Sequence, residues 1–157
     1  MLGVFGFINL LDSPTTTPTT VPVIIGGLPC CTTKIFVSFN LGGEPPSDIA
    51  SGLIAPVDTS ILGQVVTGGG GAGNYDQAIR LGVTASRANL LAFYRSHLVA
   101  LGWNLFSTTG APQGSAQLLF QKAGSDGWYW EAGVTARATG PGTTSYVYRL
   151  FQASDFS

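Results

Sequence analysis

The stretch Thr84–Trp103, TASRANLLAFYRSHLVALGW, constrains the fold of this chain more than any other. Its apolar residues recur at spacings of three, four and seven, as one face of an amphipathic helix requires: Leu90, Leu91, Tyr94, Leu98 and Leu101. Either Thr84 or Ser86 can cap its first turn, and Gly102 suits the left-handed position that ends many helices. The pattern predicts a helix over about 85–101 that leads directly into a strand.

Segments on both sides of this helix have the β-branched or alternating pattern of strands. Their ranges are 21–25, 34–39, 61–67, 75–83, 116–122, 128–136 and 144–152. Trp103 also begins an alternating run, and turn-forming residues at 123–127 and 139–142 separate the last three segments. We therefore predict an α+β domain in which one main helix packs on a mostly antiparallel sheet. Its order is β-α-β-β-β with extra N-terminal strands.

The chain begins with an apolar segment at 1–12, which a Thr/Pro-rich segment at 13–22 follows. The apolar run is shorter than the roughly 20 residues of a bilayer span, and no basic residues precede it as in a standard signal peptide. Three interpretations remain open: the outer end of a longer transmembrane helix, a short membrane or assembly anchor, and an ordinary buried segment. The Thr/Pro composition predicts a semi-rigid spacer, after which residues 23–157 form a single domain.

The charge composition argues against nucleic acid as a partner. Charged residues make up 10% of the chain, compared with about 25% in typical domains. Seven basic and eight acidic residues give a net charge of −1, which supplies no electrostatic attraction to phosphates. So few charges also give weak colloidal repulsion. We expect a protein that is extracytoplasmic, and either membrane-associated, held in an assembly, or secreted.

Two adjacent cysteines, Cys30 and Cys31, are the only ones in the chain. One interpretation is a pair of buried free thiols; the other is a vicinal or intermolecular disulfide. His97 is the only histidine and no CxxC spacing occurs. The sequence therefore predicts neither a metal site nor a cofactor.

Catalytic motifs are poorly supported. We expect His97 to be partly exposed near the helix C-terminus, and its neighbour Ser96 points away from it on a helix. The glycines at 68–71 are not followed by the Lys-Ser/Thr of a phosphate loop. No motif brings two carboxylates together for acid–base work. A non-enzymatic protein is favoured, with an enzyme of unrecognised type as the remaining alternative.

Aromatic and arginine residues on the strands are the best candidates for binding. They are Trp128, Trp130, Tyr146, Tyr148, Arg80, Arg137 and Arg149. If one aromatic row faces the helix, the other is exposed and suits a protein partner, self-association or a glycan. The arginines can receive a carboxylate or a phosphate. In the alternative, residues 23–60 cover the second face of the sheet and leave no aromatic row exposed.

A strand, a serine-containing cap, a helix, a Leu-Gly-Trp stop and a meander follow one another over residues 62–152. The residues that carry this order are Phe93, Tyr94, Arg95, Leu98, Leu101, Gly102, Trp103, Leu118, Leu119 and Phe120. The pattern resembles small ectodomains of membrane-anchored actinobacterial proteins. The resemblance implies a location and a fold, but no reaction and no functional residue. We expect a module that acts by protein–protein contact or assembly at the cell envelope, with small-ligand or glycan binding as the alternative.

Overall fold

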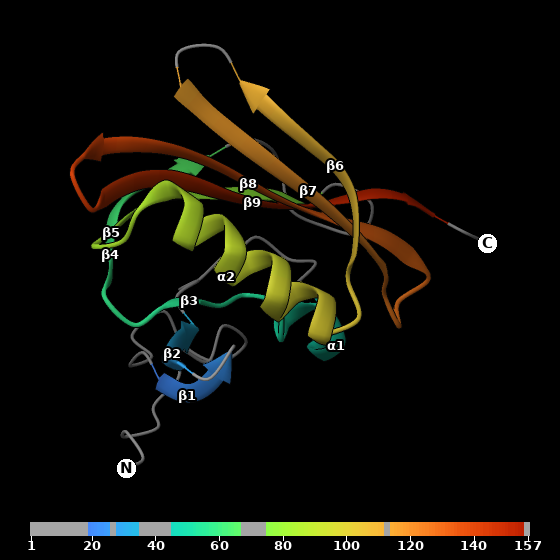
Figure 1. Ribbon diagram of the computed structural model, residues 1–157. Coiled ribbons are helices and arrows are strands. Elements are labelled where there is room, and N and C mark those ends of the chain that lie inside the picture. Colours follow the sequence, from blue (N-terminus) through green and yellow to red (C-terminus); the bar gives the residue numbers. More distant parts are fainter. Residues whose placement is uncertain (1–18, 26–27, 35–44, 67–74, 112–113, 156–157) are drawn as a thin grey trace.

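The computed structural model describes residues 19–25, 28–34, 45–66, 75–111 and 114–155 (Figure 1). Its elements are β1 (Thr19–Ile25), β2 (Leu28–Lys34), α1 (Ser47–Ala50), β3 (Ala55–Pro56), β4 (Thr59–Val66), β5 (Asp76–Val83), α2 (Arg87–Ala100), β6 (Asn104–Ala111), β7 (Ser115–Ala123), β8 (Trp128–Gly140) and β9 (Thr143–Asp155). They form a six-stranded sheet, the helix α2 beneath it, and a small three-stranded sheet below the helix.

The large sheet has the strand order β4-β5-β9-β8-β7-β6, and every pair is antiparallel. After β5 the chain crosses beneath the sheet as α2 and reaches the opposite edge at β6. It then returns through the meander β6-β7-β8-β9, so that β9 pairs with β5. The predicted α+β class with a mainly antiparallel sheet is confirmed. Four strands follow the helix rather than the three of the predicted order, because the run after Trp103 forms the full edge strand β6.

Helix α2 has defined caps at both ends. The hydroxyl of Ser86 accepts a hydrogen bond from the amide of Asn89 at 3.1 Å, which identifies Ser86 as the N-cap. At the other end Gly102 has φ of 87°. The Gly102 amide donates to the Val99 carbonyl at 3.0 Å, and the Trp103 amide donates to the Leu98 carbonyl at 2.9 Å. This pair of bonds ends the helix in a Schellman motif and directs Trp103 into the core.

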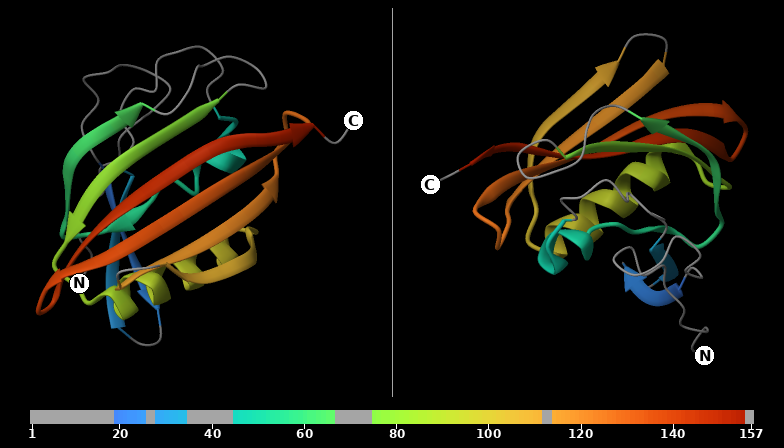
Figure 2. Two further views of the ribbon diagram at one scale, coloured as in Figure 1. Left: turned by 90° about the horizontal axis from the view of Figure 1, so that it is seen from above. Right: turned by 180° about the vertical axis from the view of Figure 1, so that it is seen from behind.

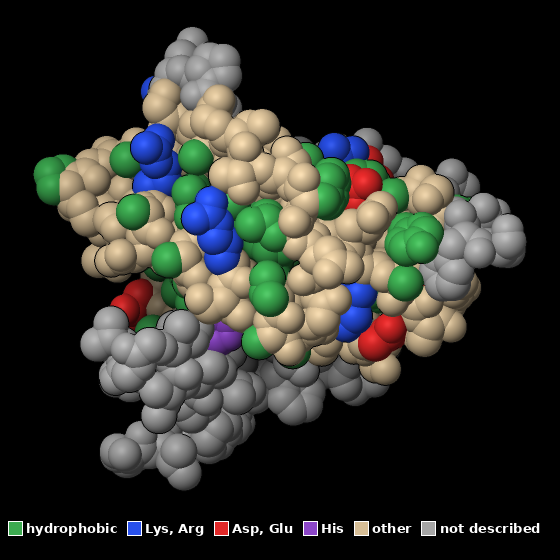
Figure 3. Space-filling model, turned by 45° about the vertical axis from the view of Figure 1, so that its right-hand side comes forward, with side chains coloured by type: hydrophobic (Ala, Val, Ile, Leu, Met, Phe, Trp, Pro, Cys, Tyr) green, Lys and Arg blue, Asp and Glu red, His purple; other side chains and the backbone are tan. Residues whose placement is uncertain are grey.

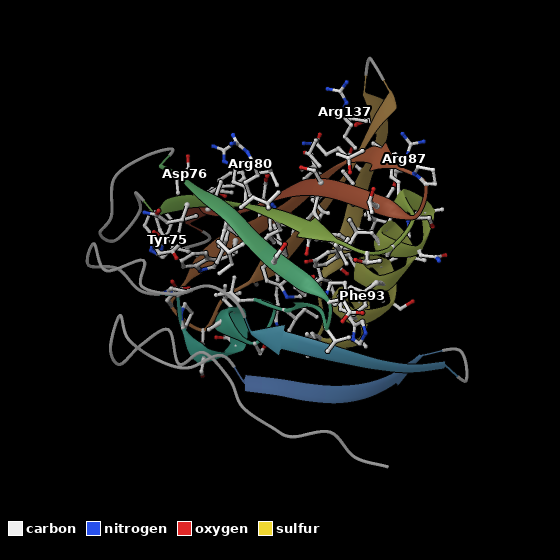
Figure 4. All side chains as sticks on the ribbon, turned by 90° about the vertical axis from the view of Figure 1, so that its left-hand side faces the viewer. Tyr75, Asp76, Arg80, Arg87, Phe93 and Arg137 are labelled. Carbon is white, nitrogen blue, oxygen red and sulfur yellow. The ribbon has the colours of Figure 1, made fainter. Side chains whose placement is uncertain are left out.

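The buried face of α2 is wider than the predicted stripe. Leu90, Tyr94 and Leu98 are buried as predicted, but Phe93 and His97 are buried as well. The prediction that His97 is partly exposed is therefore wrong, since only 7% of its surface is accessible. The reason is that α2 lies between two layers, the large sheet and the small sheet β1-β2-β3. Figure 4 shows Phe93 on the side of the helix that faces the small sheet.

The antiparallel register fixes which residues face the helix. On β9, Tyr146, Tyr148 and Leu150 lie opposite Ala136, Val134 and Ala132 of β8. Side chains alternate between the two faces of a strand, and this row and its neighbours are buried against α2. Other buried core residues come from α1, the strands and the loops: Ile49, Leu53, Ile54, Ala55, Tyr75, Ile79, Leu81, Val83, Trp103, Leu118, Phe120 and Trp130.

Several predictions concern residues that the structure does not describe. The apolar segment 1–12, the glycine run 68–71 and most of the predicted strand 34–39 lie outside the described residues, as does the spacer apart from the start of β1. The predicted strand 21–25 lies within β1. Cys30 and Cys31 lie in β2, opposite Val23 and Pro22, and their side chains are not described. Within the described ranges, no helix has the length and hydropathy that crossing a bilayer requires.

Candidate functional site

Three of the predicted binding aromatics are core residues. Trp130, Tyr146 and Tyr148 are at most 1% exposed and face α2. Trp128 is half-buried and packs against the same core. These aromatics therefore do not form an exposed row on the outer side of the sheet. Their predicted role in surface binding does not fit their buried position.

The buried tyrosines join the sheet to the segment before β4. Tyr148 donates a hydrogen bond to the Gly52 carbonyl at 2.8 Å. The Tyr94 hydroxyl lies 2.9 Å from the Ile54 carbonyl and 3.1 Å from the Tyr146 hydroxyl. A hydroxyl has one proton, so Tyr146 donates to Tyr94 when Tyr94 donates to the carbonyl. Burial raises the pKa of Tyr146 to about 12 and raises those of Tyr94 and Tyr148 as well.

The residues that alternate with this buried row form the outer face of the large sheet. We use this name for the described side chains of β5, β7, β8 and β9 that point away from α2. They include Asp76, Arg80, Gln117, Leu119, Glu131, Thr135, Arg137, Val147, Arg149 and Phe151. No described helix or strand lies over this face, which Figure 2 shows from above.

The sequence alternative that residues 23–60 cover the outer face is wrong for the part of that segment from 45 onward. Ile49, Leu53 and Ile54 are buried in the core on the helix side of the sheet. Lys122 holds this segment against the end of α2, because its ammonium donates to the carbonyls of Asp48 and Leu101 at 2.9 and 2.8 Å. Both α1 and α2 thus lie on one face of the sheet, and no described helix covers the other.

Arg149 lies at the centre of the outer face and is held by two contacts. Its guanidinium donates to both carboxylate oxygens of Asp76 at 2.8 and 2.7 Å. It also lies 4.6 Å from the ring centroid of Phe151, in cation–π geometry. The hydrogen bonds to Asp76 raise the pKa of Arg149. Small residues on the flanking strands, Ala78 and Gly133, lie directly opposite Arg149 and give its side chain room.

Glu131 lies on the same face beside Phe151 in the register. Partial burial raises its pKa, and the charge of Arg149 offsets part of this shift. The carboxylate is therefore already partly desolvated in the unbound protein.

Arg80 and Arg137 are exposed and have no ion-pair partner within the described residues. Figure 4 shows both side chains, together with Asp76, pointing away from the core. They lie two strands apart and two residues out of register, which puts their Cα atoms roughly 12 Å apart. Arg87, the third basic residue labelled in Figure 4, instead donates to the Gly114 carbonyl in the β6–β7 loop. The three predicted strand arginines are thus on one face, and two of them are available.

Apolar side chains lie between these charges. Leu119, Val147 and Phe151 are half-buried on the outer face. Leu119 leans across Gly133, where an added Cβ would be 3.2 Å from Leu119 Cδ2. Val147 and Phe151 were not among the predicted binding residues, although the alternation of β9 places them on the same face as Arg149.

The described residues offer little for catalysis. His97 Nε2 has no hydrogen-bond partner among the described residues, and burial lowers the pKa of the ring. The Phe93 ring lies beside it, with ring centroids 4.2 Å apart. No group of three His, Cys, Asp or Glu side chains in the described ranges is placed to hold a metal ion. Figure 3 shows basic side chains spread singly over the displayed surface rather than gathered in one patch.

Comparisons with protein-family models, with curated proteins and with solved structures found no match to this chain.

Proposed function

We propose that this protein is a non-enzymatic module that binds a protein partner through the outer face of its large sheet. The observation that carries the proposal is the position of both helices on one side of the sheet. No described element covers the opposite face. It presents half-buried apolar residues beside Arg80 and Arg137, which have no ion-pair partner among the described side chains. Apolar groups with arginine at their border are typical of protein interfaces.

The charge of the outer face indicates an acidic partner. It has three arginines, Arg80, Arg137 and Arg149, and two carboxylates, Asp76 and Glu131, which gives a net charge of 3 − 2 = +1. The whole chain has the opposite sign, at −1. A partner segment with carboxylates beside aliphatic residues would pair with Arg80 and Arg137 and cover Val147 and Phe151.

The location at the cell envelope is part of the proposal. It is supported by the low charge content, by the apolar segment 1–12 with its Thr/Pro-rich spacer, and by the resemblance over residues 62–152. The same segment 1–12 would hold the module at a membrane or in an assembly. His97 is buried, and no contact with a nucleophile is seen among the described side chains, which supports a binding role.

Site-specific photo-crosslinking in the cells that make the protein tests the contact surface. A photoreactive residue at Thr135, on the outer face, should give a discrete protein adduct, because a bound partner covers this position. The same residue at Ser96, on the exposed side of α2, should give none. Adduct bands are detected by gel electrophoresis and identified by mass spectrometry.

Charge reversal provides the matched control. The double variant R80E/R137E should remove most of the adduct formed from Thr135, since two close charge pairs at an interface typically contribute several-fold or more each. The variant R95E changes one exposed arginine on α2 and should leave the adduct unchanged. Equal adducts from Thr135 and Ser96, or an adduct that survives R80E/R137E, would contradict the proposal.

A further inference from the structure

A hollow of about 280 Å³ lies at one end of the large sheet, where β4 begins, β5 ends and the β8–β9 hairpin turns. Seven of its ten lining residues have a hydroxyl or a carboxylate. The lining residues are Asp58, Ser60, Leu62, Gly82, Val83, Thr84, Thr139, Thr143, Thr144 and Ser145. Gly82 and Ser145 continue the outer face toward this end of the sheet, where the lining is rich in hydroxyls rather than apolar and basic.

The floor and one wall of the hollow depend on a β-bulge and a glycine. In β4, Leu62 is the extra residue of a bulge, since Ile61 pairs with Leu81 and Gly63 pairs with Arg80. Bulges redirect side chains, and here Leu62 lies over Gly82. A Cβ on Gly82 would be 3.3 Å from Leu62 Cδ1 and 3.4 Å from Ser60 Oγ. Glycine therefore keeps the floor open while Leu62, 55% exposed, forms an apolar wall.

The opposite rim is fixed by the hairpin. Thr139 donates to the hydroxyl of Thr143 at 3.2 Å, across the turn in which Gly142 has φ of 67°. Thr144 donates to the Ala85 carbonyl at 2.8 Å, which ties β9 to the segment that follows β5. These bonds hold the rim in place, so the hollow is a preformed feature.

Three polar groups of the lining retain their bonding capacity. Asp58, Thr84 and Ser145 have no hydrogen-bond or ion-pair partner within the described residues. The hydroxyls of Thr84 and Ser145 can each donate and accept, while the ionised carboxylate of Asp58 only accepts. A ligand that fits must offer donors to Asp58 and both donors and acceptors to the hydroxyls.

Charge excludes two classes of ligand. No lysine, arginine or histidine is among the lining residues. Arg137 lies opposite Ser145 in the register but outside the lining, so an anion in the hollow would lie beside Asp58 with no cation in the lining. One carboxylate with neutral hydroxyls falls short of the several charged oxygens that protein sites for divalent cations usually combine. A neutral molecule with several hydroxyls satisfies every group, and its C–H surface can pack on Leu62.

We propose that this hollow binds a neutral sugar unit, independently of the protein partner proposed for the outer face. Its volume is just below the range of drug-sized pockets and suits one sugar ring rather than a long chain. The hollow is open and has no aromatic side chain in its lining. We therefore expect weak binding, with a Kd in the millimolar range for a single sugar.

Titration of ¹⁵N-labelled protein with glucose, galactose, mannose and N-acetylglucosamine tests this site by nuclear magnetic resonance. At least one sugar should give saturable shifts of the Gly82, Thr84 and Ser145 amides. The exposed Thr108 and Thr109 amides of β6 should not move, although they also neighbour hydroxyls. These amides of the edge strand β6 are therefore a control, because non-specific contact with polyols would shift them as well.

Two variants sharpen the titration. Asp58→Asn and Ser145→Ala should each weaken sugar binding by about five- to twentyfold, in keeping with the loss of one hydrogen bond. Thr108→Val should leave binding unchanged.

The proposal is overturned if no sugar gives saturable shifts up to about 100 mM, where a site with a Kd near 10 mM is about nine-tenths filled. It is also overturned if both hollow variants bind as the parent does, or if inorganic phosphate saturates the same amides. Adducts from Thr135 would be unaffected by these outcomes, so the two proposals fail separately.

Discussion

Raising the pH above about 10 should unfold this protein in one cooperative transition. The native state retains the protons of Tyr94, Tyr146 and Tyr148 because burial raises their pKa, in the case of Tyr146 to about 12. The unfolded chain loses these protons near pH 10. The stabilisation is therefore fully present below pH 10 and is lost as the pH rises toward the native pKa values. Each group contributes a slope of up to about 1.4 kcal/mol per pH unit, and three together up to about 4.

A loss of up to about 4 kcal/mol per pH unit is large, because the free energy of unfolding of a typical domain is only about 5–15 kcal/mol. Tyrosinate absorbance and far-ultraviolet circular dichroism should change together as the pH is raised. Tyr148→Phe should lower the slope by about one third, because it removes one of the three protons. If Tyr94, Tyr146 and Tyr148 ionise near pH 10 while the circular dichroism stays native, the assignment of these hydroxyls to the core is wrong.

Gly52→Ala should lower the melting temperature by roughly 5–10 °C. A Cβ at this position would be 2.7 Å from Nε1 of Trp103, and Trp103 is only 1% exposed. Either the indole or the backbone must move, and Gly52 also accepts the hydrogen bond from Tyr148. Overpacking of this kind costs about 1–3 kcal/mol, and each kcal/mol lowers the melting temperature of a domain of this size by about 2–4 °C. Calorimetry measures the shift.

Matched glycine variants separate overpacking from a general effect of alanine. Neither Gly63 nor Gly110 has an atom within 4 Å of the added Cβ, so Gly63→Ala and Gly110→Ala should change the melting temperature little. Trp103→Phe should partly rescue Gly52→Ala, because the smaller ring removes the clash and Trp103 Nε1 has no hydrogen-bond partner within the described part of the chain. An unchanged melting temperature for Gly52→Ala would show that Trp103 does not pack against this backbone.

Local patterns in the sequence were sufficient to predict the main elements. Ser86 and Gly102 determine the ends of α2 through their own hydrogen bonds and backbone conformation, so the helix could be located from neighbouring residues alone. Alternation located β5 and β7–β9 for the same reason. The predicted order has three strands after the helix and omits β6 as a fourth. The later residues of β6, Ser107–Ala111, are small or polar and have no apolar alternation.

The choice of face could not be predicted in the same way. Alternation shows that Tyr146 and Tyr148 share one face and that Val147 and Arg149 share the other, but not which row the helix covers. That choice depends on the crossing of α2 beneath the sheet and on the return of residues 45–58 to the same side. Both are long-range features, as the hydrogen bond from Tyr148 to Gly52 illustrates. His97 was misplaced for a related reason, because a second layer covers the helix.

The three arginines were predicted as a group, and the register places them on one face. The ion pair of Arg149 with Asp76 could not be predicted. It joins diagonal positions on the neighbouring strands β9 and β5, which are distant in sequence. The hollow at the end of the sheet was also beyond prediction. Its residues come from four separate segments, and most of them are threonines and serines that individually indicate only loops and strand ends.

Carbene footprinting tests the central claim, that the outer face of the sheet is the working surface, most directly. The protein is labelled with a photoactivated diazirine, once after purification and once in intact cells, and the modified residues are identified by mass spectrometry. We predict that Val147, Phe151 and Leu119 are labelled in the purified protein and protected in cells, while Val99, which is 54% exposed on α2, is labelled equally in both. Equal labelling of the outer face in both settings, or protection at Val99 instead, would contradict the account.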